Sequence, residues 1–193
     1  MGERADSEIV IVSGLPRAGT SLAMQMLAAG GVSVLTDGER AADDDNPRGY
    51  LELERVKQIK QDASWLPSAR GKAVKMISQL VFDLPATEAY RLIVMERDLN
   101  EVLASQEKML ARLGRTALPR DKMKVAFASQ SEPFGAWLAK QPHIAALRVS
   151  YARLVAAPPR EAARINEFLG GGLDVAAMAA AVDPALYRNR VER

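Results

Sequence analysis

The sequence predicts an α/β fold in three layers, with a mostly parallel central sheet between two layers of helices. Three observations support this. Short runs of β-branched residues alternate with amphipathic helical segments along the chain. A glycine-rich loop directly follows the first such run, at residues 14–19. The 193 residues, 48% of them hydrophobic, show no internal repeat or linker, so we expect a single domain over residues 1–193.

Hydrophobic periodicity and breaker residues place the individual elements. The run at residues 8–13 contains four consecutive β-branched residues, as in a strand buried on both faces. Gly30 and Gly31 end the helix that follows the glycine-rich loop, and Asp98 is positioned to cap a later one. Pro133 should kink or break the helix that contains it. We expect strands at 8–13, 32–35, 72–77, 90–95 and 145–150, and helices at 20–29, 51–62, 99–113, 122–140, 159–169 and 175–182.

Composition excludes several classes of protein and site. The net charge of +2, with both signs mixed along the chain, does not suggest a nucleic-acid or membrane partner. The absence of Cys excludes thiolate sites, and a single His excludes a polyhistidine metal site. No signal-peptide run or membrane-spanning stretch is present in the sequence, so we expect a cytoplasmic protein. Homodimer formation stays open.

The glycine-rich loop, residues 14–21, has the chemistry of a phosphate site. A strand, a tight loop and a helix in succession place backbone N–H groups and a helix N-terminus around an anion. Gly14 and Gly19 allow the turn, Thr20 and Ser21 place hydroxyls in the first helical turn, and Arg17 carries the loop's one full charge. The sequence therefore predicts a P-loop fold.

The pattern Gly-x4-Gly-Thr-Ser differs from the nucleoside triphosphatase loop at one position. Thr20 stands where a Lys would span the β- and γ-phosphates, ahead of the hydroxyl that holds Mg²⁺. This change disfavours an ordinary ATPase or GTPase. A P-loop kinase or nucleotide phosphotransferase remains an alternative, with Glu96 or Asp98 as the acid after a strand. So does a catalytically idle nucleotide-binding protein.

The loop resembles the 5′-phosphosulfate loop of the sulfotransferases that use 3′-phosphoadenylyl sulfate (PAPS). Pro16-Arg17-Ala18-Gly19-Thr20-Ser21 matches their usual Pro-Arg/Lys-Ser-Gly-Thr-Ser/Thr except at Ala18, which lacks the usual hydroxyl. The resemblance implies that residues of this loop (Gly14, Pro16, Arg17, Ala18, Gly19, Thr20 and Ser21) bind PAPS. It also implies transfer of a sulfuryl group to a hydroxyl or amine of a small molecule or polymer, without a metal.

Two further segments support the resemblance. Family members carry an Arg at the end of a strand and a Ser eight positions later, and together these bind the 3′-phosphate. Arg97 and Ser105 have this spacing. Tyr151, which follows a later predicted strand, matches a Tyr that can lie near the nucleotide.

The base that would take the acceptor proton is harder to place. Many family members use His, but His143 precedes a predicted strand and therefore lies at the wrong end of the sheet. Others use Glu after the second strand. There Glu39 is the first choice and Asp37 the second, with Glu52 and Glu54 as alternatives.

Two cations complete the predicted chemistry. Arg17 and the loop amides would stabilise the leaving phosphate, and Lys75 on the third strand would place a second cation near the sulfuryl group. The acceptor pocket would be built from residues 36–62 and 113–141, which carry no recognisable motif.

Overall fold

The sheet has five strands in the order β2-β3-β1-β4-β5 in a computed structural model that describes residues 7–43 and 46–188. All of the paired strands run parallel. This confirms the α/β class predicted from the alternation of strands and helices. The strands are β1 (Ile9–Gly14), β2 (Ser33–Val34), β3 (Lys72–Ile77), β4 (Tyr90–Glu96) and β5 (Ile144–Ser150).

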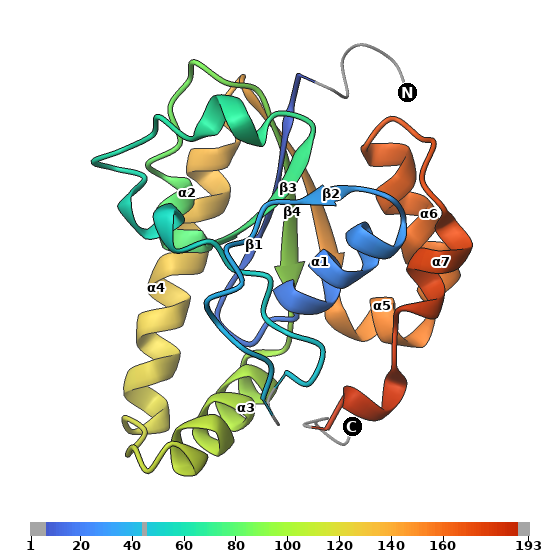
Figure 1. Cartoon of the computed structure of the whole chain (residues 1–193). Coiled ribbons are helices and arrows are strands. Elements are labelled where there is room, and N and C mark those ends of the chain that lie inside the picture. The colour runs from blue at the N-terminus through green and yellow to red at the C-terminus, as the bar shows by residue number, and fades with distance from the viewer. Residues whose placement is uncertain (1–6, 44–45, 189–193) are drawn as a thin grey trace.

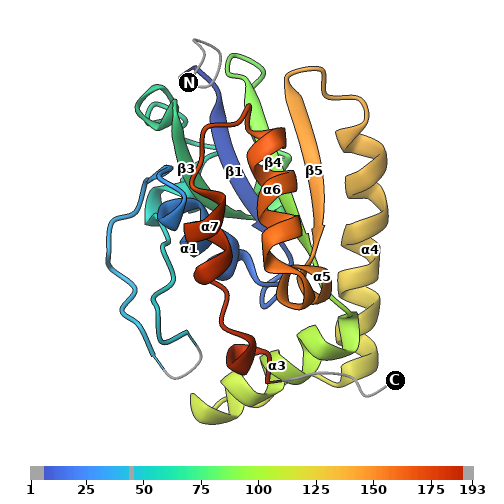
Figure 2. The ribbon, with the colours of Figure 1, turned by 90° about the vertical axis from the view of Figure 1, so that its right-hand side faces the viewer.

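Helices cover both faces of the sheet and one end of it (Figures 1 and 2). On one face lie α1 (Thr20–Ala29), α5 (Tyr151–Ala156), α6 (Pro158–Phe168) and α7 (Val175–Ala180). On the other lie α2 (Ser78–Val81), α4 (Arg120–Leu138) and the 3-10 turns η1 (Glu54–Gln58) and η2 (Leu66–Ala69). α3 (Leu99–Arg112) crosses below the carboxyl ends of the strands, near a third 3-10 turn, η3 (Pro184–Leu186).

The two faces of the central strands contribute to two separate hydrophobic clusters. Val10 and Val12 of β1 pack among α1 and the C-terminal helices. Ile9 and Ile11, which point the other way, pack with the 3-10 turns and α4. All six residues of β1 are buried, as its run of four β-branched residues predicts.

The helix predicted over residues 51–62 is wrong. Only η1 forms there, because contacts with the preceding loop take the backbone groups that an α-helix would use. The carbonyl of Glu52 accepts hydrogen bonds from the Thr36 hydroxyl (2.8 Å) and from the Asp37 amide (3.2 Å). The Val56 amide, which would bond to that carbonyl in an α-helix, instead donates to the Leu53 carbonyl at 3.1 Å.

The helix α4 continues through Pro133 without ending there. A proline costs the helix a backbone hydrogen bond. The next turn is anchored by Phe134, which is 4% exposed and packs edge-on against Phe82. Tertiary packing therefore maintains the helix across a residue that usually breaks one.

Among the described residues, no helix combines the length and the apolar character that a membrane span requires.

Candidate functional site

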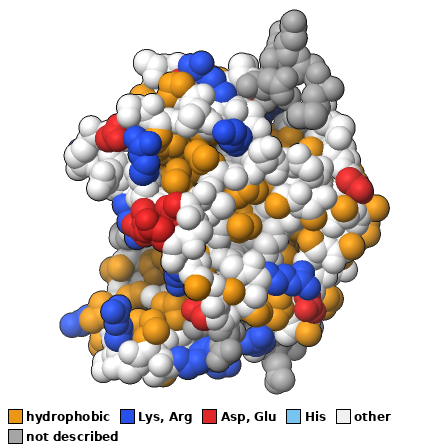
Figure 3. Space-filling view, in the orientation of Figure 1, with side chains coloured by type: hydrophobic (Ala, Val, Ile, Leu, Met, Phe, Trp, Pro, Cys, Tyr) orange, Lys and Arg blue, Asp and Glu red, His pale blue; other side chains and the backbone are white. Residues whose placement is uncertain are grey.

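A cavity of about 810 Å³ opens at the carboxyl ends of β1, β3 and β4. Its wall includes the glycine-rich loop, one face of α3, the segment after β2 and the residues around η3. The space-filling view shows the hollowed surface above α3, with apolar and charged side chains around it (Figure 3). In open parallel sheets this edge is where ligands bind.

The glycine-rich loop forms as the sequence predicts, and its two key glycines cannot be replaced without strain. Gly19 has a φ of 101°, and a Cβ on it would lie 2.3 Å from the Tyr151 ring. A Cβ on Gly14 would lie 2.7 Å from the Met95 carbonyl oxygen. Of the predicted loop residues only Ala18 is absent from the cavity wall, because its methyl group is buried in the core below.

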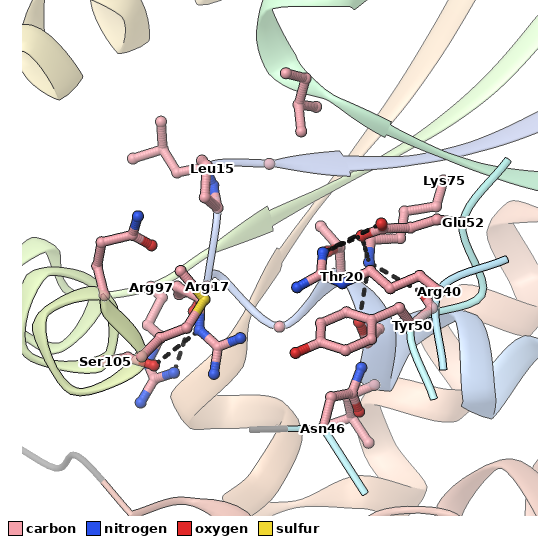
Figure 4. Close-up of a pocket in the computed structure, with 18 of the residues that line it drawn as sticks. Leu15, Arg17, Thr20, Arg40, Asn46, Tyr50, Glu52, Lys75, Arg97 and Ser105 are labelled. Carbon is pink, nitrogen blue, oxygen red and sulfur yellow. Dashed lines mark hydrogen bonds and ion pairs between the residues drawn. The ribbon is translucent and has the colours of Figure 1, made fainter. Parts of the chain in front are cut away.

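Arg17 stands at the centre of the loop in a left-handed conformation, with φ of 69°. Its Nε donates to Ser105 Oγ at 3.0 Å, and its carbonyl accepts from Arg97 Nη1 at 3.1 Å. Arg17, predicted as the loop cation, thus contacts both residues predicted to bind the 3′-phosphate (Figure 4). Ser105 is 88 positions from Arg17 in the sequence, and Arg97 is 80 positions away. Burial lowers the pKa of Arg17 from its ordinary value, which lies so high that the side chain stays charged at neutral pH.

Arg97 is anchored by residues that sequence reasoning missed. Its Nε pairs with Glu101 at 3.0 Å, and both side chains are below 10% exposed, at 7% and 6%. The Tyr187 hydroxyl donates to the other Glu101 oxygen at 2.8 Å. The guanidinium carbon lies 4.5 Å from the Tyr151 ring centre and 5.3 Å from that of Tyr187. The Glu four positions after Arg97 was the one available signal, since this spacing brings two side chains together on a helix.

Lys75 lies on the other side of the glycine-rich loop (Figure 4). Its ammonium donates to three oxygens: Ser21 Oγ at 3.0 Å, the Tyr50 carbonyl at 3.0 Å and Glu52 Oε1 at 2.8 Å. Its side chain is 10% exposed, and burial lowers the pKa of Lys75. Burial also opposes ionisation of Glu52, but Lys75 and Arg40 outweigh it, and the pKa of Glu52 is lowered.

Contacts of Tyr50 hold the segment after β2 close to Lys75 and Glu52. The Arg40 guanidinium carbon lies 3.4 Å from the Tyr50 ring centre, and the Tyr50 hydroxyl donates to Asp43 at 2.8 Å. Burial, followed by the bond to Asp43, raises the pKa of Tyr50. Asp43 is the first of three consecutive acids, and the other two, at positions 44 and 45, fall outside the described residues. Within the described ranges, no group of three His, Cys, Asp or Glu side chains could hold a metal ion.

The structure does not bring the two preferred carboxylates to the cavity. Glu39 and Asp37 are exposed and absent from its wall, whereas Glu52 and Glu54 line it. Asp37 accepts hydrogen bonds from the amides of Glu54 (2.6 Å) and Glu39 (3.1 Å), which lower its pKa. His143 lies at the amino end of the sheet, where its ring packs against the first residue of β4.

Sequence comparison with protein-family models and with curated proteins finds no match. Solved structures do match over nearly the whole chain. The sulfotransferase domain from the curacin biosynthetic pathway is 13% identical, with a TM-score of 0.53, over 96% of this chain and 92% of that one. A sulfotransferase from Alicyclobacillus acidocaldarius is also 13% identical, with a TM-score of 0.50, over 95% and 97%. The chain has the sulfotransferase fold. The predicted resemblance is confirmed at this level.

The cavity wall also carries several large apolar side chains. Leu15 of the loop, Leu53, Ile77 at the end of β3, Leu80 and Met109 of α3 all contribute. Ile77 is 42% exposed, which is unusual for so large an apolar side chain at the end of a central strand. The cavity therefore combines a cationic anion site with an apolar compartment.

Proposed function

We propose that the protein transfers a sulfuryl group from PAPS to a hydroxyl or amine acceptor. The observation that carries the proposal is the glycine-rich loop. It carries Arg17 as its one full charge, has Thr20 at the position of the Lys of nucleoside triphosphatases, and opens at the carboxyl edge of a sheet with the sulfotransferase fold. A loop of this kind binds a phosphate through its amides and the N-terminus of α1.

The residues on the wall fit a nucleotide that is phosphorylated at both ends. Arg17 and the hydroxyls of Thr20 and Ser21 would meet the phosphosulfate end. Arg97 and Ser105 would meet the 3′-phosphate, as the sequence predicts. The hydrogen bonds of Arg97 to Glu101 and to the Arg17 carbonyl use two of the five N–H groups of its guanidinium.

PAPS supplies an activated sulfuryl group with a phosphate as leaving group. The chain's part is to stabilise the charge that develops on that phosphate and to take the acceptor's proton. Arg17 and Lys75 supply the charge. For the proton we propose Glu52, because it lines the cavity and its lowered pKa keeps it ionised at neutral pH.

We propose a small apolar alcohol, phenol or amine as the acceptor. Such a molecule would lie against the apolar wall formed by Leu53, Ile77 and Leu80, with its reactive group directed towards the loop. Burial of apolar surface would hold it there without directional contacts.

Calorimetry tests which nucleotide binds, by comparing PAP (the nucleotide that remains when PAPS has lost its sulfuryl group) in metal-free buffer with ATP in the presence of Mg²⁺. Saturable PAP binding is expected, and binding of ATP–Mg²⁺ with no response to PAP would contradict the proposal in favour of a kinase. Transfer of labelled sulfate from PAPS to a panel of apolar alcohols, phenols and amines then tests the activity. PAP binding without transfer across the panel would indicate a nucleotide-binding protein that is catalytically idle.

A further inference from the structure

Lys75 has an unusual position for a lysine. It lies in the middle of β3, opposite Val12 of β1, and its neighbours Val74 and Met76 are buried. Burying an ammonium ion is costly unless hydrogen bonds replace its water shell. Here three oxygens do so, one for each N–H group, and they come from α1 (Ser21) and from the segment after β2 (Tyr50 and Glu52).

One of these oxygens has a defined role in other P-loop proteins. Ser21 follows the second loop glycine by two positions, which is the position of the hydroxyl that ligates Mg²⁺ in the Gly-x4-Gly-Lys-Ser/Thr loop. In this chain the Ser21 hydroxyl instead accepts a hydrogen bond from Lys75 Nζ at 3.0 Å. The ammonium therefore lies beside the hydroxyl that would otherwise hold the metal.

The other two oxygens have the same chemical character. They are the main-chain carbonyl of Tyr50 and the carboxylate of Glu52. Like the Ser21 hydroxyl, both are hard oxygen ligands of the kind that Mg²⁺ accepts. This group of three oxygens, which we term the Lys75 cage, would suit a small cation. It is filled by a cation that belongs to the chain.

We propose that the Lys75 ammonium takes the place of the divalent cation of P-loop nucleotide enzymes and thereby selects a metal-free nucleotide. The proposal rests on the proposed function only in requiring that the loop binds a nucleotide anion. A fixed single charge matches a sulfuryl group, which carries less charge than a terminal phosphate. It also repels Mg²⁺, and with it the metal-bound form of ATP.

The test begins with the unaltered protein. Its affinity for PAP, measured by calorimetry, should be the same with and without magnesium chloride, and Mn²⁺ should give no bound signal in electron paramagnetic resonance. A requirement for Mg²⁺ would overturn the proposal without any variant. If ATP rather than PAP binds, the proposed function fails, but indifference of ATP binding to Mg²⁺ would still support the role of Lys75.

Lys75→Ala then opens the cage and keeps its oxygens. We expect PAP to bind about 10- to 100-fold more weakly in metal-free buffer. We also expect Mn²⁺ to bind and Mg²⁺ to restore part of the lost affinity. The matched control Lys75→Ala/Glu52→Gln removes the carboxylate and should abolish Mn²⁺ binding. A folded Lys75→Ala protein that binds PAP unchanged and takes up no Mn²⁺ would show that Lys75 only supports Glu52.

Discussion

Arg17 is the residue on which the proposed nucleotide site depends most directly. Its backbone is in the left-handed region, its carbonyl is held by Arg97 and its side chain by Ser105. A charged side chain in such a fixed position has little freedom to lose when a phosphate binds, which favours affinity. The contact between Arg17 and Ser105 also means that a ligand between them must exchange that bond for its own.

We predict that Arg17→Ala weakens PAP binding by about 10- to 100-fold or more, because a charge-assisted hydrogen bond to phosphate is lost. The fold should remain, since the loop backbone keeps its own contacts. Calorimetry and thermal unfolding measure the two effects. Arg70→Ala is the control, because it removes an exposed arginine paired with Glu88, outside the cavity wall. PAP affinity equal to that of the parent protein would contradict the assignment of the loop.

The carboxylate that takes the proton can be identified by comparing two substitutions. We expect Glu52→Gln to lower sulfate transfer from PAPS at least about 100-fold, the usual scale for loss of a general base. PAP binding should change much less. Glu39→Gln should leave transfer close to that of the parent, because Glu39 is exposed and outside the cavity wall. The opposite pattern would restore Glu39, the choice made from the sequence.

At the scale of elements, α3 carries part of the cavity wall and begins at a strong cap. The Asp98 carboxylate accepts hydrogen bonds from the amides of Asn100 and Glu101. The cap fixes the first turn, which places Glu101 against Arg97 and, one turn later, Ser105 against Arg17. Local helix chemistry therefore determines the position of side chains that contact the loop.

We predict that Asp98→Ala lowers the free energy of unfolding by about 0.5–2 kcal/mol, as for other N-caps, and also weakens PAP binding. Asp174→Ala is the matched control, because Asp174 caps α7 in the same way through Ala177 and is absent from the cavity wall. Urea unfolding and calorimetry measure both variants. Equal losses of PAP affinity would show that the effect follows general stability and not the placement of α3.

Most elements were predictable because their signals are local. The β-branched runs and the helix capped by Asp98 agree with the structure within a few residues. The failure at residues 51–62 came from distant partners, since Thr36 and Asp37 take the backbone groups of that segment. No pattern within the segment could have revealed those bonds.

The residues of the candidate site also fall into those that local sequence predicts and those that it does not. Gly14, Gly19 and Arg17 were found because a phosphate loop has a fixed spacing in one short stretch of sequence. The Lys75 cage and the Tyr187–Glu101 bond join residues 23 to 86 positions apart, and spacing carries no information about such pairs. Structure was therefore needed to show which acids face the cavity.

For the whole molecule, the aromatic ring of Tyr187 ties the C-terminal segment to the buried Arg97–Glu101 pair. Burial, with the nearby Glu101 carboxylate, raises the pKa of Tyr187 to about 12. The folded protein thus holds this proton more tightly than the unfolded chain, whose tyrosines titrate near an ordinary pKa of about 10. The resulting stabilisation is complete below that pH and is lost as the pH rises towards 12.

We predict that the free energy of unfolding of Tyr187→Phe falls less steeply than that of the parent between about pH 10 and pH 12. Urea unfolding at a series of pH values measures the slopes. Tyr90, whose pKa is also raised by burial, is present in both proteins, so its contribution cancels in the difference. Parallel curves would indicate that the Tyr187 phenol is no harder to ionise in the folded protein than in the unfolded chain.

The bond between Tyr187 and Glu101 has a practical consequence for handling the protein. The described chain ends at Arg188, which lies on the cavity wall, whereas it begins at Ser7, just before the amino end of β1 and at the opposite end of the sheet (Figure 1). A bulky label attached at Arg188 itself would crowd the mouth of the cavity and pull on the neighbouring Tyr187. Attachment at Ser7, at the opposite end of the sheet, would leave the cavity open to ligands.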